Sequence, residues 1–484
     1  MNYKMMGRFI SQILLLEAVF MLPAMCISIV CGEQKAVLGF TVSILLIMAV
    51  FAVLKYLCRA HKKGFYARDG LVCVGIGWIV LSLMGCLPFY ISGAIPSFLD
   101  ALFEIVSGFT TTGASILTEV ESLPKGILYW RSFSHWVGGM GVLVFLLAIV
   151  PAGEKQSGFT MHILRAESPG PSVGKLVPRM RRTAGILYLL YMTLTILNII
   201  FLLIGKMPVF DAVCTAFGTA GTGGFGIKND SIAGYSPYLQ NVCTVFMLLF
   251  GVNFSCYYLL VMKRIRNVLH DEELRLYFGV VIVSTLLIVW NLGSYYSSLG
   301  ETVRHSAFQV ASIITTTGFA TTDFDQWPVF SKSIILCLMV VGACAGSTGG
   351  GIKCSRVILL FKSLYRNIRK VLDPQKVQIV RINGNKVDES VVENTNIYLA
   401  AYVIIIIFSF LIVSLDGFSI TTNFSAVLSC FNNIGPGLET VGPTANFSQF
   451  GILSKIVLIM DMLAGRLEIY PILILFSRSA WRHR

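Results

Sequence analysis

Ten long apolar stretches, separated by short polar segments, set the pattern of the chain. A helix that crosses a bilayer needs about 20 predominantly apolar residues, and each stretch reaches or approaches that length. The predicted spans are Phe9 to Val30, Ala36 to Tyr56, Leu71 to Ile91, Ser132 to Val150, Gly185 to Ile204, Leu239 to Met262, Leu276 to Leu292, Ser331 to Phe361, Ile397 to Leu415 and Ile452 to Phe476. This pattern predicts an all-α polytopic membrane protein.

Four shorter apolar stretches lie between pairs of the later spans, and each runs into a segment rich in threonine, asparagine and glycine. They begin near Asp100, Asp211, Glu301 and Thr422. Because none is long enough to cross, we predict short helices that enter the membrane and turn back, with Asp100 as the N-cap of the first. Irregular backbone at membrane depth must be buried in protein or line a watery cavity. Small side chains there leave carbonyls free to face a cation, as in the carbonyl rings of potassium filters.

The short stretches divide the chain into five units. Residues 1–68 form an N-terminal two-helix unit, and pore repeats follow at 69–155, 156–266, 267–390 and 391–484. Each repeat has two spans around one short helix, so all four short helices enter from the same side. We therefore predict four membrane-pore-membrane repeats in a pseudo-four-fold arrangement, with an added N-terminal helix pair.

The distribution of charge indicates topology and argues against nucleic-acid binding. The formal net charge is +13, yet only 13% of residues are charged and 55% are hydrophobic. The basic clusters lie in loops at Lys55 to Arg68, Lys155 to Arg182, Lys263 to Arg275, Arg356 to Lys386 and Arg478 to Arg484. By the positive-inside rule, these loops and both termini are cytoplasmic, which predicts a multi-pass protein of the inner, cytoplasmic membrane.

Side chains typical of catalysis or metal binding form no pattern. The 12 cysteines lie mostly in apolar stretches without metal-type spacing, so we interpret them as small core residues. No nucleophile–base pair stands out, and for His135 a structural role is favoured over a place near a pore mouth. We predict that the chain is not an enzyme and holds no cofactor of its own.

The second span of the third repeat is interrupted between Gly342 and Lys353, where five glycines occur. Each glycine weakens a helix by about 1 kcal/mol relative to alanine, so we predict two half-helices joined by a polar loop just inside the short helices. A nucleotide-binding P-loop is disfavoured, because it requires Lys and then Ser or Thr directly after its second glycine. Here Ile352 precedes Lys353 and Cys354 follows it.

One arginine, Arg466, lies in the middle of the last apolar stretch. An ionisable residue at membrane depth usually faces the bundle interior or a water-filled path. We favour a charge that lines the pathway over a buried pair with Asp461 or Glu468.

Seven motifs together resemble the bacterial Trk/Ktr/HKT potassium-uptake superfamily, most closely its TrkH branch, over essentially the whole chain. They are TTTGAS at Thr110 to Ser115, LRAESPGP at Leu164 to Pro171, TGGFG at Thr222 to Gly226, TTTGFATTDF at Thr315 to Phe324, CAGSTGGGIK at Cys344 to Lys353, NNIGPGL at Asn432 to Leu438 and GRLEIY at Gly465 to Tyr470. Family members often have glycine after GPGL, where this chain has Glu439, at the predicted outer mouth.

The resemblance implies a set of site residues. Filter glycines are expected at Gly113, Gly223, Gly318 and Gly435. The expected potassium-binding filter comprises Thr111, Thr112, Gly113, Gly221, Thr222, Gly223, Thr316, Thr317, Gly318, Asn433, Ile434 and Gly435. The expected gate is an intramembrane loop of Gly346, Ser347, Thr348, Gly349, Gly350, Gly351 and Lys353. Arg466 is expected to project into the pathway beneath the filter.

The resemblance also implies a function and partners. The expected function is potassium uptake, as symporter or channel, by a homodimer with one pore per subunit. A cytosolic ring of TrkA-type subunits is expected to control the gate and to carry the nucleotide, either NAD or ATP/ADP. The alternative is a sodium- or proton-coupled secondary transporter, which typically has inverted repeats and paired broken helices.

Overall fold

The computed structural model describes residues 3–58, 67–139, 141, 180–293, 295–375 and 378–481. Helices dominate this part of the chain, and a two-stranded antiparallel hairpin of β1 (Arg381–Ile382) and β2 (Asn385–Lys386) adds to them. The motif at Leu164 to Pro171, and most of the predicted span Ser132 to Val150 beyond α6 (Lys125–Gly139), lie outside the described residues.

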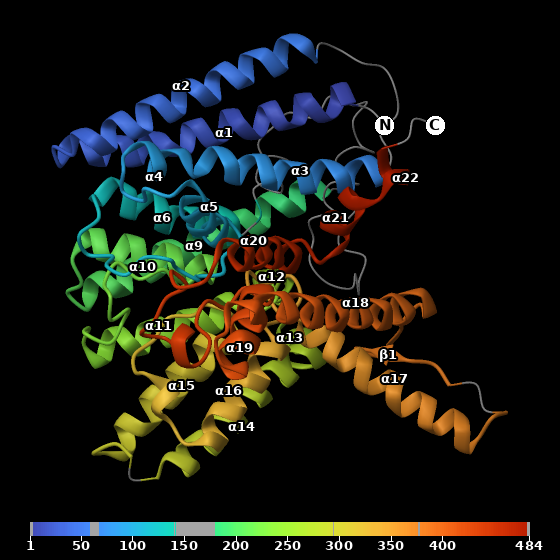
Figure 1. Ribbon diagram of the computed structural model, residues 1–484. Coiled ribbons are helices and arrows are strands. Elements are labelled where there is room, and N and C mark those ends of the chain that lie inside the picture. The colour runs from blue at the N-terminus through green and yellow to red at the C-terminus, as the bar shows by residue number, and fades with distance from the viewer. Residues whose placement is uncertain are drawn as a thin grey trace.

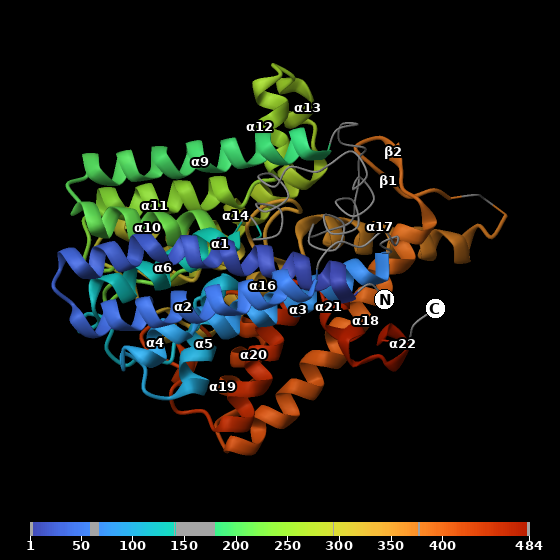
Figure 2. The ribbon, with the colours of Figure 1, turned by 90° about the horizontal axis from the view of Figure 1, so that it is seen from above.

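Six apolar helical stretches within the described ranges are long enough to cross a membrane, and a bent pair makes a seventh candidate. They are α1 (Tyr3–Val30), α2 (Gln34–Leu57), α3 (Ala67–Gly85) with α4 (Leu87–Ile91), α9 (Met180–Ile204), α14 (Glu272–Leu292) and α18 (Glu389–Val413). α1 packs against both α2 and α3, and the three run side by side in Figures 1 and 2. The chain is therefore a helical membrane protein.

Four short helices lie between these elements: α5 (Phe98–Phe109), α10 (Val209–Gly221), α15 (Leu299–Ile314) and α19 (Ile420–Phe431). Three of them begin at a serine whose side chain accepts the N–H three residues later, as helix N-caps do. These serines are Ser97, Ser298 and Ser419. The prediction of Asp100 as N-cap is wrong: Ser97 caps the helix, and the Asp100 carboxylate lies 2.6 Å from Lys455.

Three of the predicted spans are broken. α11 (Pro237–Phe250) and α12 (Phe254–Val261) meet at 88°. Gly251 is the C-cap of the first helix, and Asn253 caps the second by accepting the Ser255 N–H. α16 (Val329–Val341) and α17 (Cys354–Leu372) are separated by the glycine-rich segment, as predicted. α20 (Ile452–Arg466) stops before α21 (Tyr470–Leu473), where Glu468 and Ile469 have φ of 57° and 70°. Apolar composition alone gave no sign of the first and third breaks.

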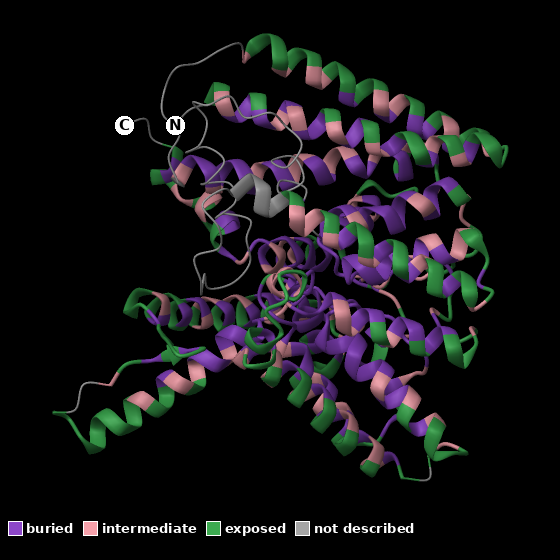
Figure 3. Ribbon diagram, turned by 180° about the vertical axis from the view of Figure 1, so that it is seen from behind, coloured by how far each residue is buried: buried purple, intermediate pink, exposed green. Residues whose placement is uncertain are grey.

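Burial increases from the outer helices to the centre of the molecule (Figure 3). α2 is largely exposed, and the far half of α17 projects from the body of the molecule (Figures 1 and 2). The short α13 (Ile265–Leu269) lies next to α12. The start of α1 and the short α22 (Arg478–Trp481) lie together, because the Tyr3 hydroxyl donates to the Trp481 carbonyl at 3.1 Å. The buried centre is where the four short helices end.

Candidate functional site

Each of the four short helices ends in the same backbone turn. The second residue of each turn has a left-handed backbone conformation, which non-glycine residues seldom adopt. These residues are Thr111 (φ 55°), Thr222 (54°), Thr316 (58°) and Asn433 (56°). We call the four equivalent segments the ring strands 1 to 4: residues 110–113, 221–224, 315–318 and 432–435.

Hydrogen bonds fix the same register in all four ring strands. The residue after the left-handed one donates its N–H to a carbonyl five residues earlier. The pairs are Thr112 to Ser107 (2.8 Å), Gly223 to Gly218 (2.9 Å), Thr317 to Ser312 (2.8 Å) and Ile434 to Ser429 (3.0 Å). Strands 1 and 3 share the sequence Thr-Thr-Thr-Gly, while strands 2 and 4 differ from it and from each other, yet all four share one backbone conformation.

A glycine with positive φ follows in every ring strand: Gly113, Gly224, Gly318 and Gly435. At each one, an added Cβ would collide with the carbonyl of the next ring strand, and for Gly435 the distance to the Thr112 oxygen would be 2.8 Å. The carbonyls met in turn are those of Gly223, Thr317, Ile434 and Thr112. The contacts thus run from strand 1 to 2, 3, 4 and back to 1, and they close a ring.

The structure shifts one predicted position. The sequence pattern equated Gly223 with Gly113, but by backbone conformation and hydrogen bonding Gly224 is the equivalent residue and Gly223 corresponds to Thr112. Glycine occupies positions 221, 223, 224 and 226, so spacing alone offers no landmark there. The left-handed Thr222 supplies it.

The glycine-rich loop, residues 342–353, lies against ring strands 3 and 4. Gly350 donates its N–H to Thr316 Oγ1 at 2.6 Å. An added Cβ at Gly350 would meet the Asn432 carbonyl, and one at Gly349 would lie 2.8 Å from the Thr315 carbonyl. The loop and the ring are therefore in direct backbone contact.

The bend between α11 and α12 holds the same loop from the other side. Cys344 N donates to the Gly251 carbonyl at 3.1 Å, and Phe254 N donates to the Gly346 carbonyl at 3.0 Å. The bend leaves free backbone N–H and C=O groups that a continuous helix would pair within itself. It therefore serves as a docking point for the loop.

Sequence reasoning missed Glu273, which clasps both ends of the loop. Its Oε1 accepts the N–H of Ala345 at 2.6 Å and the N–H of Ser355 at 2.9 Å. The residue is buried although it lies in the first turn of α14. The signal available in the sequence was an acidic pair, Glu272 and Glu273, at the head of an apolar span.

Arg466 reaches under the ring and ties the loop to α6. Its guanidinium donates to the Thr348 carbonyl at 2.9 Å and to the carbonyls of Gly138 and Gly139, the latter at 2.8 Å. The two acids weighed as its partners have other contacts: Glu468 forms an ion pair with Arg356, and Asp461 accepts the Ser409 hydroxyl at 2.7 Å. Backbone carbonyls are thus prominent partners of this charge.

Comparison with known proteins identifies the family to which this chain belongs. The model of a family described as "TrkH: Cation transport protein" matches residues 37–482. The Trk system potassium uptake protein TrkH of Salmonella typhimurium is 36% identical, with 92% of each chain covered, and that of Halomonas elongata is 33% identical with full coverage of both. The chain belongs to the TrkH family of cation transport proteins.

A solved structure agrees with this membership. The crystal structure of the potassium transporter TrkH from Vibrio parahaemolyticus superposes with a TM-score of 0.88 at 31% identity, and the match covers all of both chains. The bent and broken helices of this TrkH-family chain therefore sit within a fold that is already known from experiment.

The strand-1 side of this TrkH-family site contains an ion pair that sequence reasoning also missed. Glu104 on α5 accepts from Arg131 Nε on α6 at 2.6 Å, and both side chains are buried. The same carboxylate accepts the Ile116 N–H at 3.0 Å. Arg131 in turn donates to the Gly226 carbonyl at 2.8 Å. One ion pair therefore joins the segments that follow ring strands 1 and 2.

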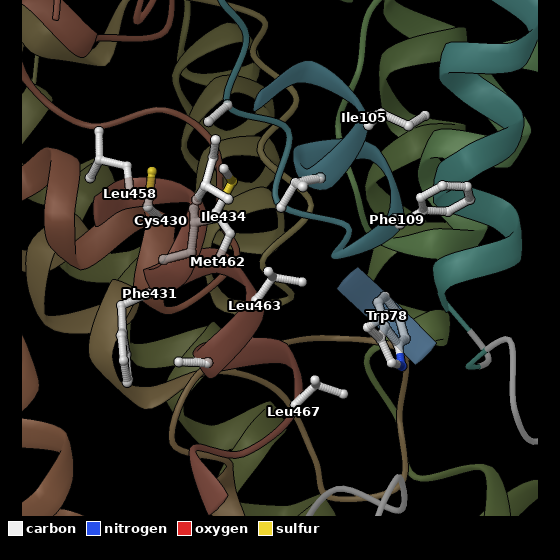
Figure 4. Close-up of a cluster of buried hydrophobic side chains, with 14 of the residues drawn as sticks. Trp78, Ile105, Phe109, Cys430, Phe431, Ile434, Leu458, Met462, Leu463 and Leu467 are labelled. Atoms are coloured by element: carbon white, nitrogen blue, oxygen red, sulfur yellow. The ribbon is translucent and has the colours of Figure 1, made fainter. Parts of the chain in front are cut away.

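Apolar packing supports the ring on the strand-4 side. Ile434 is fully buried beside Cys430 and Met462, while Ile105 and Phe109 of α5 lie across from them (Figure 4). Asn433 Nδ2 donates both to Thr112 Oγ1 and to the Met462 carbonyl, each at 2.9 Å. The first and last ring strands are thus joined by side chains as well as by backbone.

Proposed function

We propose that this protein carries potassium ions into the cell through the ring. The observation that supports this most strongly is the cyclic contact of four ring strands with one backbone conformation. Such a ring presents backbone oxygens in place of a cation's hydration shell and needs no charged side chain. The names of the relatives, potassium uptake proteins, favour potassium as the ion.

The filter in this proposal consists of Thr111, Thr112 and Gly113 with their equivalents in the other strands. By the register of the structure, strand 2 contributes Thr222, Gly223 and Gly224. Each strand follows a short helix between apolar elements, which fits four membrane-pore-membrane repeats around one axis. The helix C-terminal ends carry partial negative charge, which favours cations.

The glycine-rich loop is the proposed gate, comprising Gly346 to Gly351 and Lys353. Its contact with ring strands 3 and 4 supports a position against the pathway, and Lys353 donates to the Gly349 carbonyl within the loop. Arg466 fixes Thr348 and adds a positive charge that opposes cation passage. Releasing the loop would widen the path.

The proposal includes control by a cytosolic ring of TrkA-type subunits, which would carry NAD or ATP/ADP, and the same geometry supports it. α17 leads directly from the loop and has Arg369 and Lys370 in its last turn. A partner that moves this basic end would pull on the gate. The Trk system names of the relatives agree with a multi-component system. In this proposal the protein is a homodimer of the inner membrane with cytoplasmic termini.

Ion flux through the purified protein in liposomes tests the proposal. We expect potassium uptake down its own gradient, with sodium passing far more slowly. Uptake that occurs only with a sodium or proton gradient, together with saturation by a small solute, would favour the secondary-transporter alternative. Equal flux of potassium and sodium would contradict the proposal that the ring is a potassium-selective filter.

A further inference from the structure

Ring strand 2 lacks the side chain that the other strands have at one position. Gly223 is equivalent by hydrogen bonding to Thr112, Thr317 and Ile434. In those three strands the side chain at this position is buried. A glycine there would leave a gap behind the ring unless another group fills it.

The imidazole of His135 fills this gap. An ideal Cβ added at Gly223 would overlap the imidazole ring, with Cδ2 only 2.6 Å away. Gly223 has no positive φ, so its conformation accepts an L side chain and the imidazole is what excludes one. His135 is completely buried and comes from α6, an element of the preceding repeat.

Two hydrogen bonds fix both nitrogens of the imidazole. Nδ1 lies 2.8 Å from the Gly108 carbonyl, which only accepts, and Nε2 lies 3.2 Å from the Phe225 N–H, which only donates. These partners assign the neutral tautomer with the proton on Nδ1. The imidazole thereby connects the end of α5 with the residue directly after Gly224.

The other strands obtain this support from their own short helices. Glu104 of α5 accepts the Ile116 N–H, Ser312 of α15 donates to the Phe319 carbonyl at 2.6 Å, and Ser425 of α19 accepts the Leu438 N–H at 3.0 Å. After strand 2, Phe225 N donates instead to His135, and the Gly226 carbonyl accepts from Arg131, both of α6. Strand 2 is thus held by its neighbour.

We propose that His135 is a positioning residue for selectivity: its neutral imidazole takes the place of the missing strand-2 side chain and holds Gly223 and Gly224 in the ring. The role in selectivity rests on the proposed function, whereas the packing does not. For strand 2 to match the other three strands, the space behind Gly223 must be filled and both hydrogen bonds must be made.

A swap of side-chain volume tests the packing. Gly223→Thr alone places the new side chain against the imidazole, and we expect a lowered melting temperature and lost flux. His135→Ala with Gly223→Thr recreates the arrangement of strands 1 and 3, and we expect partial recovery of both. Gly223→Ala with and without His135→Ala repeats the test if the threonine variant does not fold.

Gly224→Thr is the matched control for the swap. Its added side chain would meet the Thr317 carbonyl and not the imidazole. We therefore expect His135→Ala to give Gly224→Thr no recovery. Recovery of both glycine variants, or of neither, would overturn the assignment of the imidazole to the gap behind Gly223.

Ion selectivity tests the positioning role. We expect His135→Ala to lower the ratio of potassium to sodium flux about tenfold through the loss of two hydrogen bonds, and His135→Gln, which retains an acceptor near Phe225 N, to regain part of it. The control is His270→Ala, because His270 is exposed and its Nδ1 bonds the Arg266 carbonyl in the segment between α12 and α14. An unchanged ratio in His135→Ala would overturn the role. If the unmodified protein passes no potassium, the proposed function fails, and the melting temperatures still decide the packing.

Discussion

The four ring strands keep one backbone conformation although strands 2 and 4 differ in sequence from strands 1 and 3, whereas the layer beneath them differs among the second, third and fourth repeats. Below the ring, α11 and α12 meet at a sharp bend, α16 and α17 are separated by a twelve-residue loop, residues 342–353, and α20 ends at Arg466. The ring strands contact each other cyclically, so each restrains the next. Among the described residues, the elements of the layer beneath bond to each other in unlike pairs.

This difference suggests that selectivity and control lie in separate parts of the proposed pathway: selectivity in the ring, and control in the layer beneath it. A cyclic set of backbone contacts leaves little freedom to any one strand, as a filter requires. The loop is held by a few individual bonds, chiefly from Glu273, Thr316 and Arg466. A few such hydrogen bonds can be broken and replaced at a modest cost in free energy, which suits the movement that the proposed gate requires. The predictions below test each side of this comparison.

The largest effect is expected from Gly113→Ser, which attacks the ring itself. The residue has a φ of 80°, and its Cβ would collide with the Gly223 carbonyl. Strain and lost contact of about 1–3 kcal/mol should lower the ratio of potassium to sodium flux by roughly ten- to a hundredfold. The control is Gly93→Ser, because Gly93 has a φ of 74° with nothing near its Cβ. Equal losses in the two variants would show that backbone strain alone, and not the ring, causes the effect.

Removal of Gly349 to Gly351 should come next, and it attacks the layer beneath. The shortened loop can no longer bond Thr316, so we expect higher basal flux, unchanged potassium preference and a weaker response to the cytosolic partner. Flux measured without that partner gives the basal rate, and flux measured with it gives the response. A stable variant that stays closed without the partner would show that this loop is not the gate.

Glu273→Ala should loosen the loop without shortening it. It removes an acceptor of two N–H groups, each bond worth about 1.5–3 kcal/mol when the acceptor is charged. We expect basal flux to rise by about tenfold or more if closure depends on those bonds. Glu272→Ala is the matched control, since Glu272 contacts Lys362 and Asn383 N and not the loop. A rise of the same size in both variants would contradict the clasp.

Arg466→Ala should have a smaller effect on flux and little on selectivity. It removes a positive charge beneath the ring and three hydrogen bonds to carbonyls. A fixed cation near a narrow path lowers the local concentration of cations, so we expect a several-fold rise in single-channel or liposome flux. Arg466→Lys should stay near the unmodified rate. No rise in a well-folded alanine variant would place Arg466 off the pathway.

The smallest effect is expected from Glu439→Gln at the outer mouth. Hydrogen bonds from Ser419 and Thr422 lower the pKa of the Glu439 carboxyl below its ordinary value. A lowered pKa in the folded protein contributes stability at neutral pH that is lost as the pH falls through that pKa. Glu439→Gln should therefore reduce the acid sensitivity of the melting temperature slightly and leave selectivity unchanged. A changed potassium preference would extend the filter to this residue.

Much of the architecture follows from composition and spacing, because the bilayer imposes a length on every span. Sequence reasoning located the four short helices and the break between α16 and α17 from apolar runs and glycines. It missed the bend at Asn253 and the break after Arg466, since both lie within longer apolar stretches and depend on partners elsewhere: the loop for the bend, and Arg356 for Glu468.

The candidate site shows the same limit. Ring strands 1, 3 and 4 carried enough landmarks to be aligned, but strand 2 was shifted by one residue, because glycine occurs at three of its four positions. Only tertiary contacts settle its register. Glu273 and Arg131 were also missed, because their roles lie in accepting and donating across helices that are far apart in the sequence. His135 was recognised as structural, while its place behind Gly223 required coordinates.

The closure of the ring between Thr112 and Gly435 has a consequence for biosynthesis. Asn433 and Thr112 are 321 positions apart, so ring strand 1 is made long before its last neighbour exists. At synthesis rates of about 5–20 residues per second, strand 4 leaves the ribosome roughly ten seconds after strand 3. During that interval the nascent chain holds three quarters of an aperture, with one side open to lipid or to the translocation machinery. A ribosome that stops before residue 432 therefore leaves a product in which the ring of four strands cannot close.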